Sequence, residues 1–216
     1  MSTQRNEFIR FLKLLDDNGC LRHVILVGSW AEFLYEECGL IEGFEANIKT
    51  LDIDFLLKNQ RLPNPPKNLA EIARGAGYLV ESDRLTGTTK IYDKAGLEIE
   101  FLLGKVGAGL EFALETNLGI TAQTLRHMDV LKRNTQALDF LGMKVFVPLP
   151  EAYAIHKMII NKERGKKQEK DARAIEHLLP YLHDDVFASI EKTLTKRERN
   201  AVESFLTETG TTRIPG

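Results

Sequence analysis

Long apolar runs, cysteine and an excess of either charge are all scarce in this sequence of 216 residues. We find no apolar stretch long enough to span a membrane, and residues 1–11 lack the apolar core of a signal peptide. Cys20 and Cys38 are too few for a disulfide framework and show no metal-ligand spacing. The formal net charge of −2 argues against a global basic field that would attract nucleic acid. These absences favour a cytoplasmic protein with reduced thiols and no membrane partner.

The chain does contain enough apolar residues for one large core or two small ones, with 43% hydrophobic composition. Its character changes at residues 148–150, where the sequence reads Pro-Leu-Pro. Strands and helices alternate before this point, and only helices follow it. We therefore expect an α/β (α+β) catalytic domain over residues 1–147 and a C-terminal helical domain over residues 148–216.

Apolar periodicity and turn residues give the expected elements. Strands are predicted at residues 22–27, 51–57, 78–81, 88–92 and 97–103, with a last pair of short strands within 137–147. Helices are predicted at residues 6–18, 30–37, 68–74, 121–127, 151–164, 170–181, 184–194 and 196–208.

Two of these strands, at residues 51–57 and 97–103, alternate acids with hydrophobes. Asp52 and Asp54 therefore share one face of their strand, although aspartate is a poor strand former. Carboxylates on adjacent strands repel each other unless a cation lies between them. If the two strands are neighbours, their acids can hold a divalent metal for phosphoryl chemistry. The alternative is a half-exposed strand with solvated acids.

The second acidic strand offers two candidates for a third carboxylate, Glu98 and Glu100, on one face. Glu100 precedes Phe-Leu-Leu as Asp54 does, so we prefer Glu100 and leave Glu98 open. Alternation alone is also compatible with an exposed edge that carries two solvated glutamates.

Gly28 and Ser29 lie between a buried strand and a helix. Glycine lets another group approach the backbone closely, and a helix N-terminus suits a phosphate. The alternative is an ordinary turn glycine followed by a serine N-cap.

The helices after residue 150 carry further candidates. Tyr153, Lys157 and Arg164 fall on one helix face, where Lys157 among apolar side chains suits an anion such as a triphosphate, or simply snorkels to water. Asp171 continues the buried face of the next helix and needs a partner or a function, unless it only serves the helix dipole. The basic run 162–170 suits phosphates of a nucleotide or RNA, or is a solvated turn.

Taken in order, these motifs resemble the nucleotidyltransferase superfamily, whose fold is shared with DNA polymerase beta. The family pattern is a hydrophobic strand with Gly-Ser, a helix, an Asp-x-Asp strand and a third acid on a neighbouring strand. The matching residues are Gly28 and Ser29, Asp52 and Asp54, and Glu100. The resemblance implies a mixed sheet flanked by helices.

The C-terminal part resembles a bacterial branch that includes the toxins of type IV abortive-infection systems. That branch has a Pro-x-x-Ala segment before a helix with a functional lysine, and then a basic stretch ending in Lys-Asp. Here these are Pro150 and the residues after it, Lys157, and the stretch from Arg164 to Asp171. The sequence departs from the family in lacking a basic residue early in the helix after Ser29 and in a long spacing from Gly28 to Asp52.

The resemblance implies a reaction in which an NTP such as ATP gives its NMP to an acceptor hydroxyl, with release of pyrophosphate. Asp52, Asp54 and Glu100 would hold two Mg²⁺ (or Mn²⁺) ions, and Glu100 would also serve as a base. Gly28, Ser29, Lys157 and Arg164 would bind the triphosphate, and Asp171 would orient Lys157 or assist proton removal.

The implied acceptor is an RNA 3′ end such as that of tRNA, or else a small molecule or a protein hydroxyl, and an antitoxin partner is a further expectation. A basic face built from Arg126, Lys132, Arg133 and residues 162–170 would support RNA. Two alternatives stay open: a non-catalytic interaction protein that retains the fold, and a metal-dependent phosphoesterase.

Overall fold

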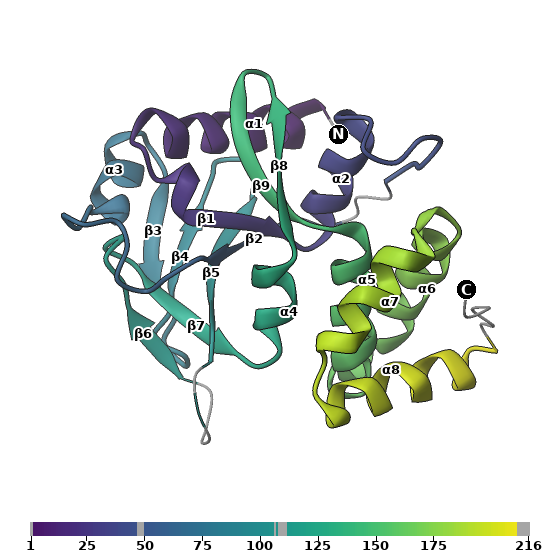
Figure 1. Ribbon diagram of the computed structural model, residues 1–216. Coiled ribbons are helices and arrows are strands. Elements are labelled where there is room, and N and C mark those ends of the chain that lie inside the picture. Colours follow the sequence, from purple (N-terminus) through teal and green to yellow (C-terminus); the bar gives the residue numbers. More distant parts are fainter. Residues whose placement is uncertain (1, 47–49, 106, 108–111, 211–216) are drawn as a thin grey trace.

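The centre of the molecule is a mixed sheet, seen in the computed structural model, which describes residues 2–46, 50–105, 107 and 112–210. Figure 1 shows this sheet with helices beside it and a group of helices at the C-terminal side. Its path of hydrogen-bonded strands is β1 (Val24–Val27), β2 (Asp52–Leu57), β5 (Glu98–Gly104), β4 (Thr89–Tyr92) and β3 (Leu79–Ser82). The predicted α/β class and mixed sheet are confirmed.

The two acidic strands are neighbours, as predicted. β2 and β5 run parallel with Asp52 opposite Glu98 and Asp54 opposite Glu100. Their odd-numbered residues between 53 and 57 and between 99 and 103 are buried on the other face, which fixes the register because a slip by one residue would bury the acids.

The opposite faces of the sheet have separate cores. One face packs against α1 (Ser2–Asp17) and belongs to the large cluster that includes Phe8, Phe11 and Phe55. The carboxylate face carries a smaller cluster around Leu56, Leu102 and Met128, the first residue of α4 (Met128–Arg133). The acids therefore share their face with only a small apolar cluster.

The strand order corrects one sequence prediction. Residues 121–127 were expected to form a helix, but β7 (Thr121–Leu125) pairs with the second half of β5 and with β6 (Ala113–Glu115). The two buried residues of β7, Ala122 and Thr124, are two apart, which is the period of a strand rather than of a helix. β4 pairs with residues 98–100 of β5, and β7 pairs with residues 102–104.

The remaining elements before residue 148 frame this sheet. They are η1 (Leu21–His23), α2 (Ser29–Glu37), α3 (Leu69–Gly75), β8 (Thr135–Phe140) and β9 (Met143–Pro148). β8 and β9 form an antiparallel hairpin, which confirms the last predicted strand pair. Among the described residues, no helix is both long enough and apolar enough to cross a membrane.

After residue 148 the chain is helical, as predicted. The elements are α5 (Pro150–Ile160), η2 (Asn161–Glu163), η3 (Gly165–Lys167), α6 (Gln168–Leu178), η4 (Leu179–Tyr181), α7 (Asp184–Thr193) and α8 (Lys196–Glu208). The hydroxyl of Tyr35 in α2 donates to the carbonyl of Pro148 at 2.9 Å, directly before α5. Buried residues of α5 belong to the same large cluster as those of α1 and α2, and a division at residue 148 stays a prediction.

Candidate active site

Gly28 connects β1 to α2 in a conformation that favours glycine, with φ +71° and ψ −163°. A Cβ atom at this position would lie 2.9 Å from Oδ2 of Asp54, so the turn passes directly against that carboxylate. α2 begins at Ser29, and its first amides have no partners in their own helix. The predicted strand, Gly-Ser turn and helix are present, and the turn brings the N-terminus of α2 to the acidic strand.

Asp52 and Asp54 lie on the same face of β2, both half-buried. The amide of Asp52 donates to Oγ1 of Thr50 at 3.1 Å, which fixes the start of the strand. Burial, and then the charges of Glu100 and Asp52, raise the pKa of Asp54 to about 6. The charges of the neighbouring acids therefore disfavour ionised Asp54. A cation bound between the carboxylates would reduce this repulsion.

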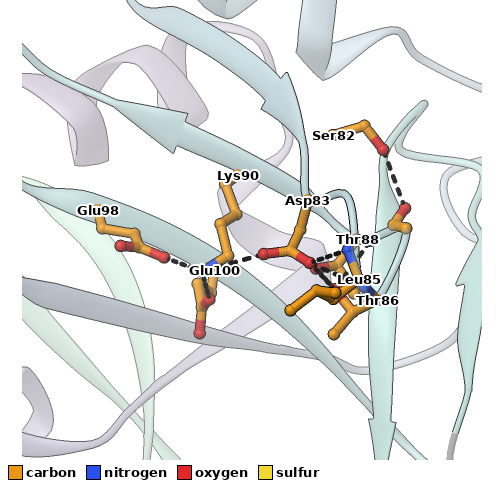
Figure 2. A network of polar contacts seen from close by, with 9 residues as sticks. Ser82, Asp83, Leu85, Thr86, Thr88, Lys90, Glu98 and Glu100 are labelled. Carbon is orange, nitrogen blue, oxygen red and sulfur yellow. Dashed lines mark hydrogen bonds and ion pairs between the residues drawn. The ribbon is translucent and has the colours of Figure 1, made fainter.

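The glutamates of β5 are bound by a lysine that sequence reasoning missed (Figure 2). Nζ of Lys90, on β4, forms ion pairs with Glu98 and, at 2.8 Å, with Oε1 of Glu100. Hydrogen bonds to both glutamates raise the pKa of Lys90, with Glu100 contributing most. Oδ2 of Asp83 lies 3.9 Å from Nζ of Lys90. The other oxygen of Asp83 accepts hydrogen bonds from the amides of Leu85 and Thr86, in the turn that follows it. Glu100 is thus neutralised by Lys90.

The donor set suits a metal that arrives with phosphate. Within the described residues, no group of three or more His, Cys, Asp or Glu side chains is close enough to hold an ion alone. Mg²⁺ is usually bound through one or two carboxylates together with substrate phosphates, which Asp52 and Asp54 can match. The prediction that Glu100 is the third ligand stays a prediction, since Lys90 binds it here.

The C-terminal candidates come together as an ion-paired group. Asp171 accepts from Nζ of Lys157 at 2.9 Å and from Nε of Arg164 at 2.8 Å. Burial would raise the pKa of Asp171, but these two cations outweigh it and lower the pKa. Nζ of Lys157 also lies 5.0 Å from the centre of the Tyr153 ring. Asp171 is buried, as predicted, whereas the predicted helix at residues 151–164 is too long: α5 ends at Ile160, and Arg164 reaches Asp171 from the turn between η2 and η3.

Glu32 is a second residue that the sequence reasoning did not single out. It is buried in the first turn of α2 and accepts a hydrogen bond from the hydroxyl of Tyr153 at 2.5 Å. Burial raises the pKa of Glu32, which Tyr153 and Lys157 partly offset. Its sequence signal is one acid among the apolar residues at the start of that helix.

These groups line one cleft between the sheet and the C-terminal helices. A cavity of about 120 Å³ has Gly28, Ser29, Asp52 and Asp54 on its sheet side. Its helical side carries Lys157, Arg164, Lys167, Lys170 and Asp171, so cations face carboxylates across it. Glu32 and Lys170 also line an adjacent hollow of about 790 Å³. Glu100 is not among the residues that line the cleft. It lies beside Asp54, on the neighbouring strand β5.

Comparisons with known proteins bear on this arrangement. A nucleotidyltransferase family model matches residues 6–197, which is most of the chain. One solved structure, an antigenic nucleotidyltransferase-like protein from Paracoccidioides brasiliensis, is similar at 13% identity and a TM-score of 0.45, covering 87% of this chain and 80% of that one. A search of curated proteins gave no significant match. The family match carries the assignment: the chain belongs to the nucleotidyltransferase family.

Proposed function

We propose that this protein is a metal-dependent nucleotidyltransferase that transfers NMP from an NTP to an acceptor hydroxyl. The observation that carries the proposal is the cleft in which Asp52 and Asp54 face a cationic helix wall, with the Gly28 turn against Asp54. Phosphoryl transfer depends mainly on positioning and on charge stabilisation, and this cleft supplies groups for both.

The cationic wall is the proposed site of the triphosphate. Lys157 is held by Asp171 and by the Tyr153 ring, so its ammonium is oriented before a ligand arrives. Arg164 is 39% exposed and bound to the other oxygen of Asp171, which leaves guanidinium N–H groups for a phosphate. The N-terminus of α2 adds backbone amides next to Ser29, of which that of Ala31 already donates to the carbonyl of Gly28 at 3.1 Å. As pyrophosphate leaves, these groups stabilise the charge that develops on it.

Asp52, Asp54 and Glu100 are the proposed metal ligands. Bound Mg²⁺ or Mn²⁺ would supply Lewis-acid activation of the α-phosphate and of the acceptor hydroxyl. Asp54 and Glu100 are directly opposite on adjacent strands, and Glu100, not Glu98, is among the charges that raise the pKa of Asp54. This favours Glu100 as the third ligand. The ion pair between Lys90 and Glu100 must then break before Glu100 binds a metal.

The proposed acceptor is an RNA 3′ end such as that of tRNA, and a small molecule or a protein hydroxyl is the alternative. The attacking oxygen displaces pyrophosphate from the α-phosphate, and its proton passes to Glu100. The relation to abortive-infection toxins and the existence of an antitoxin partner stay predictions from the sequence.

Incubation with each α-³²P-labelled NTP, Mg²⁺ or Mn²⁺, and a cell extract tests the proposal. The expected result is label on an acceptor that is absent with Asp52→Ala/Asp54→Ala. Release of free labelled nucleotide without a labelled acceptor would favour a phosphoesterase. No labelling and no metal-dependent NTP binding would favour a non-catalytic interaction protein.

A further inference from the structure

A second hollow, of about 430 Å³, lies away from the cleft and is lined by basic side chains. Lys58, Arg61, Lys105 and Lys132 contribute to its walls, and none of the described residues that line it is acidic. We call it the basic groove. Because the whole chain carries a net charge of −2, this concentration of cations is local and is not a consequence of composition.

The groove is built at the carboxyl ends of the strands that carry the acids. Lys58 directly follows β2, and its amide continues the ladder to β1 by donating to the carbonyl of His23 at 3.0 Å. A Cβ atom at Gly104, the last residue of β5, would lie 3.9 Å from Nζ of Lys132, which places that ammonium over the end of the strand. Lys132 also pairs with Asp129, at 3.4 Å, on the exposed side of α4.

Lys58 is held in the groove by packing. Nζ of Lys58 lies 2.8 Å from the centre of the Phe146 ring, and the side chain is half-buried. Burial, and then the charge of Lys144, lower the pKa of Lys58 to about 8. Lys58 has no carboxylate within ion-pair distance among the described residues, so an anion bound here would compensate its charge.

An exposed aromatic side chain stands at the rim of the groove. Phe112 is 54% exposed, and it is the only exposed aromatic residue among the large hydrophobic residues of the described chain. Its backbone is fixed, because its amide and carbonyl both bond to Oγ1 of Thr124 at 2.9 Å and 2.7 Å. An exposed ring on a fixed backbone, beside several cations, is a combination that binds stacked bases and their phosphates.

The groove and the acids occupy the same face of the sheet. Lys58 is four residues beyond Asp54, and an even separation along an extended chain places both side chains on the same face. Phe146, on which Lys58 packs, also packs against the small cluster of that carboxylate face. At about 3.3 Å per residue, the two positions are roughly 13 Å apart along β2.

We propose that the basic groove binds the single-stranded 3′ segment of a nucleic-acid acceptor, with one base stacked on Phe112 and its phosphates on Lys58, Arg61 and Lys132. This inference rests on the proposed nucleotidyl transfer, because the strand would place its 3′ hydroxyl at Asp52 and Asp54. The small cluster around Leu56 and Leu102, with Met128 and Leu131 of α4 packed on it, covers the face between them, so the strand would pass around α4.

Fluorescence anisotropy with labelled 12-nucleotide single strands of RNA and of DNA, without metal or NTP, tests the groove separately from the reaction. We expect Arg61→Ala/Lys132→Ala to weaken binding at least tenfold and to reduce the salt slope by about 1.4, since each lost phosphate contact removes about 0.7. Phe112→Ala should weaken binding at least about fivefold, the low end for loss of one stacked base. Comparison of RNA with DNA identifies the sugar that is preferred.

The matched control is Lys13→Ala, which removes an exposed lysine from α1, the helix on the opposite face of the sheet. It should bind as the wild type does. Equal binding of a 12-base-pair duplex, or variants in the groove that bind like the wild type, would overturn the proposal. Asp52→Ala/Asp54→Ala should still bind the strand, so loss of labelling with retained binding separates failure of the catalytic site from failure of the groove.

Discussion

Asp54 and Glu100 stand directly opposite each other on the parallel strands β2 and β5, and Lys90 binds Glu100 from β4. Glu98 has the same relation to Asp52 and the same lysine partner. The two glutamates therefore form a natural pair of test and control. Only Glu100 is among the charges that raise the pKa of Asp54.

Glu100→Gln should reduce nucleotidyl transfer more than about 100-fold, whereas Glu98→Gln should keep activity within a few-fold of the wild type. The reason is that loss even of an outer-shell partner of a metal costs roughly 10- to 100-fold, and a ligand costs more. Steady-state labelling at saturating Mg²⁺ measures both. Equal losses in the two variants would remove the distinction that we draw between them.

Lys90→Met should bind Mn²⁺ about tenfold more tightly than the wild type, because removal of a competing cation relieves roughly 1.4 kcal/mol of repulsion at the carboxylates. Isothermal titration calorimetry in the presence of a non-hydrolysable NTP analogue makes the measurement. Lys94→Met, on the exposed turn after β4, is the control. Weaker Mn²⁺ binding by Lys90→Met would mean that the lysine positions Glu100 instead of competing for it.

Asp171→Asn should raise the KM for the NTP about tenfold with a smaller change in kcat. Asp171 holds Lys157 and Arg164 toward the cleft, and an amide binds these cations less strongly than a carboxylate does. Initial rates against NTP concentration give both constants. Glu176→Gln, an exposed change on the same helix, controls for a general effect on α6, and the positioning role is refuted if KM stays constant in Asp171→Asn.

The free energy of unfolding should depend on His156 between about pH 6.5 and pH 3. Burial lowers the pKa of His156 to about 3, so the unfolded state binds one more proton than the folded state in this window. Stability from this residue is complete above pH 6.5 and is lost as the pH falls, by up to about 1.4 kcal/mol per pH unit.

Urea unfolding of the wild type and of His156→Gln from pH 7 to pH 4 measures this contribution. The variant should lose less stability than the wild type, since the amide does not titrate. His177→Gln, at an exposed position, should follow the wild type. If the free energy of unfolding of His156→Gln and of the wild type changes with pH in the same way, the claim that His156 is buried in its neutral form is contradicted.

Much of the site follows from local pattern in the sequence. The alternation of acids and hydrophobes gives the face that Asp52 and Asp54 share. Lys157 lies on α5 as predicted, but Arg164 lies beyond the end of that helix and meets Lys157 through their shared partner, Asp171. The buried stripe of α6 places Asp171 facing inward. These features depend on residues close in the chain, so a single sequence contains them.

Lys90 was missed because its contacts depend on a register that the sequence does not fix. A four-residue turn at 93–96 would pair Tyr92 with Leu97 and Lys90 with Ile99. The structure pairs Tyr92 with Glu98 and Lys90 with Glu100, so five residues connect the strands. This difference of one residue decides which side chains Lys90 meets.

The helix predicted at residues 121–127 failed for a related reason. The identity of β7 depends on the open edge of β5 beyond residue 100, which only the assembled sheet provides. Glu32 was missed because its partner, Tyr153, lies 121 positions further along the chain. Long-range pairing therefore accounts for each omission.

The most direct test of the central claim compares ATP labelled at the α-phosphate with ATP labelled at the γ-phosphate, using the wild type and Asp54→Asn with a single-stranded RNA. The account predicts that only the α-label joins the RNA, that pyrophosphate is released in equal amount, and that Asp54→Asn does neither while folding normally. Transfer of the γ-label, or full activity in Asp54→Asn, would contradict it.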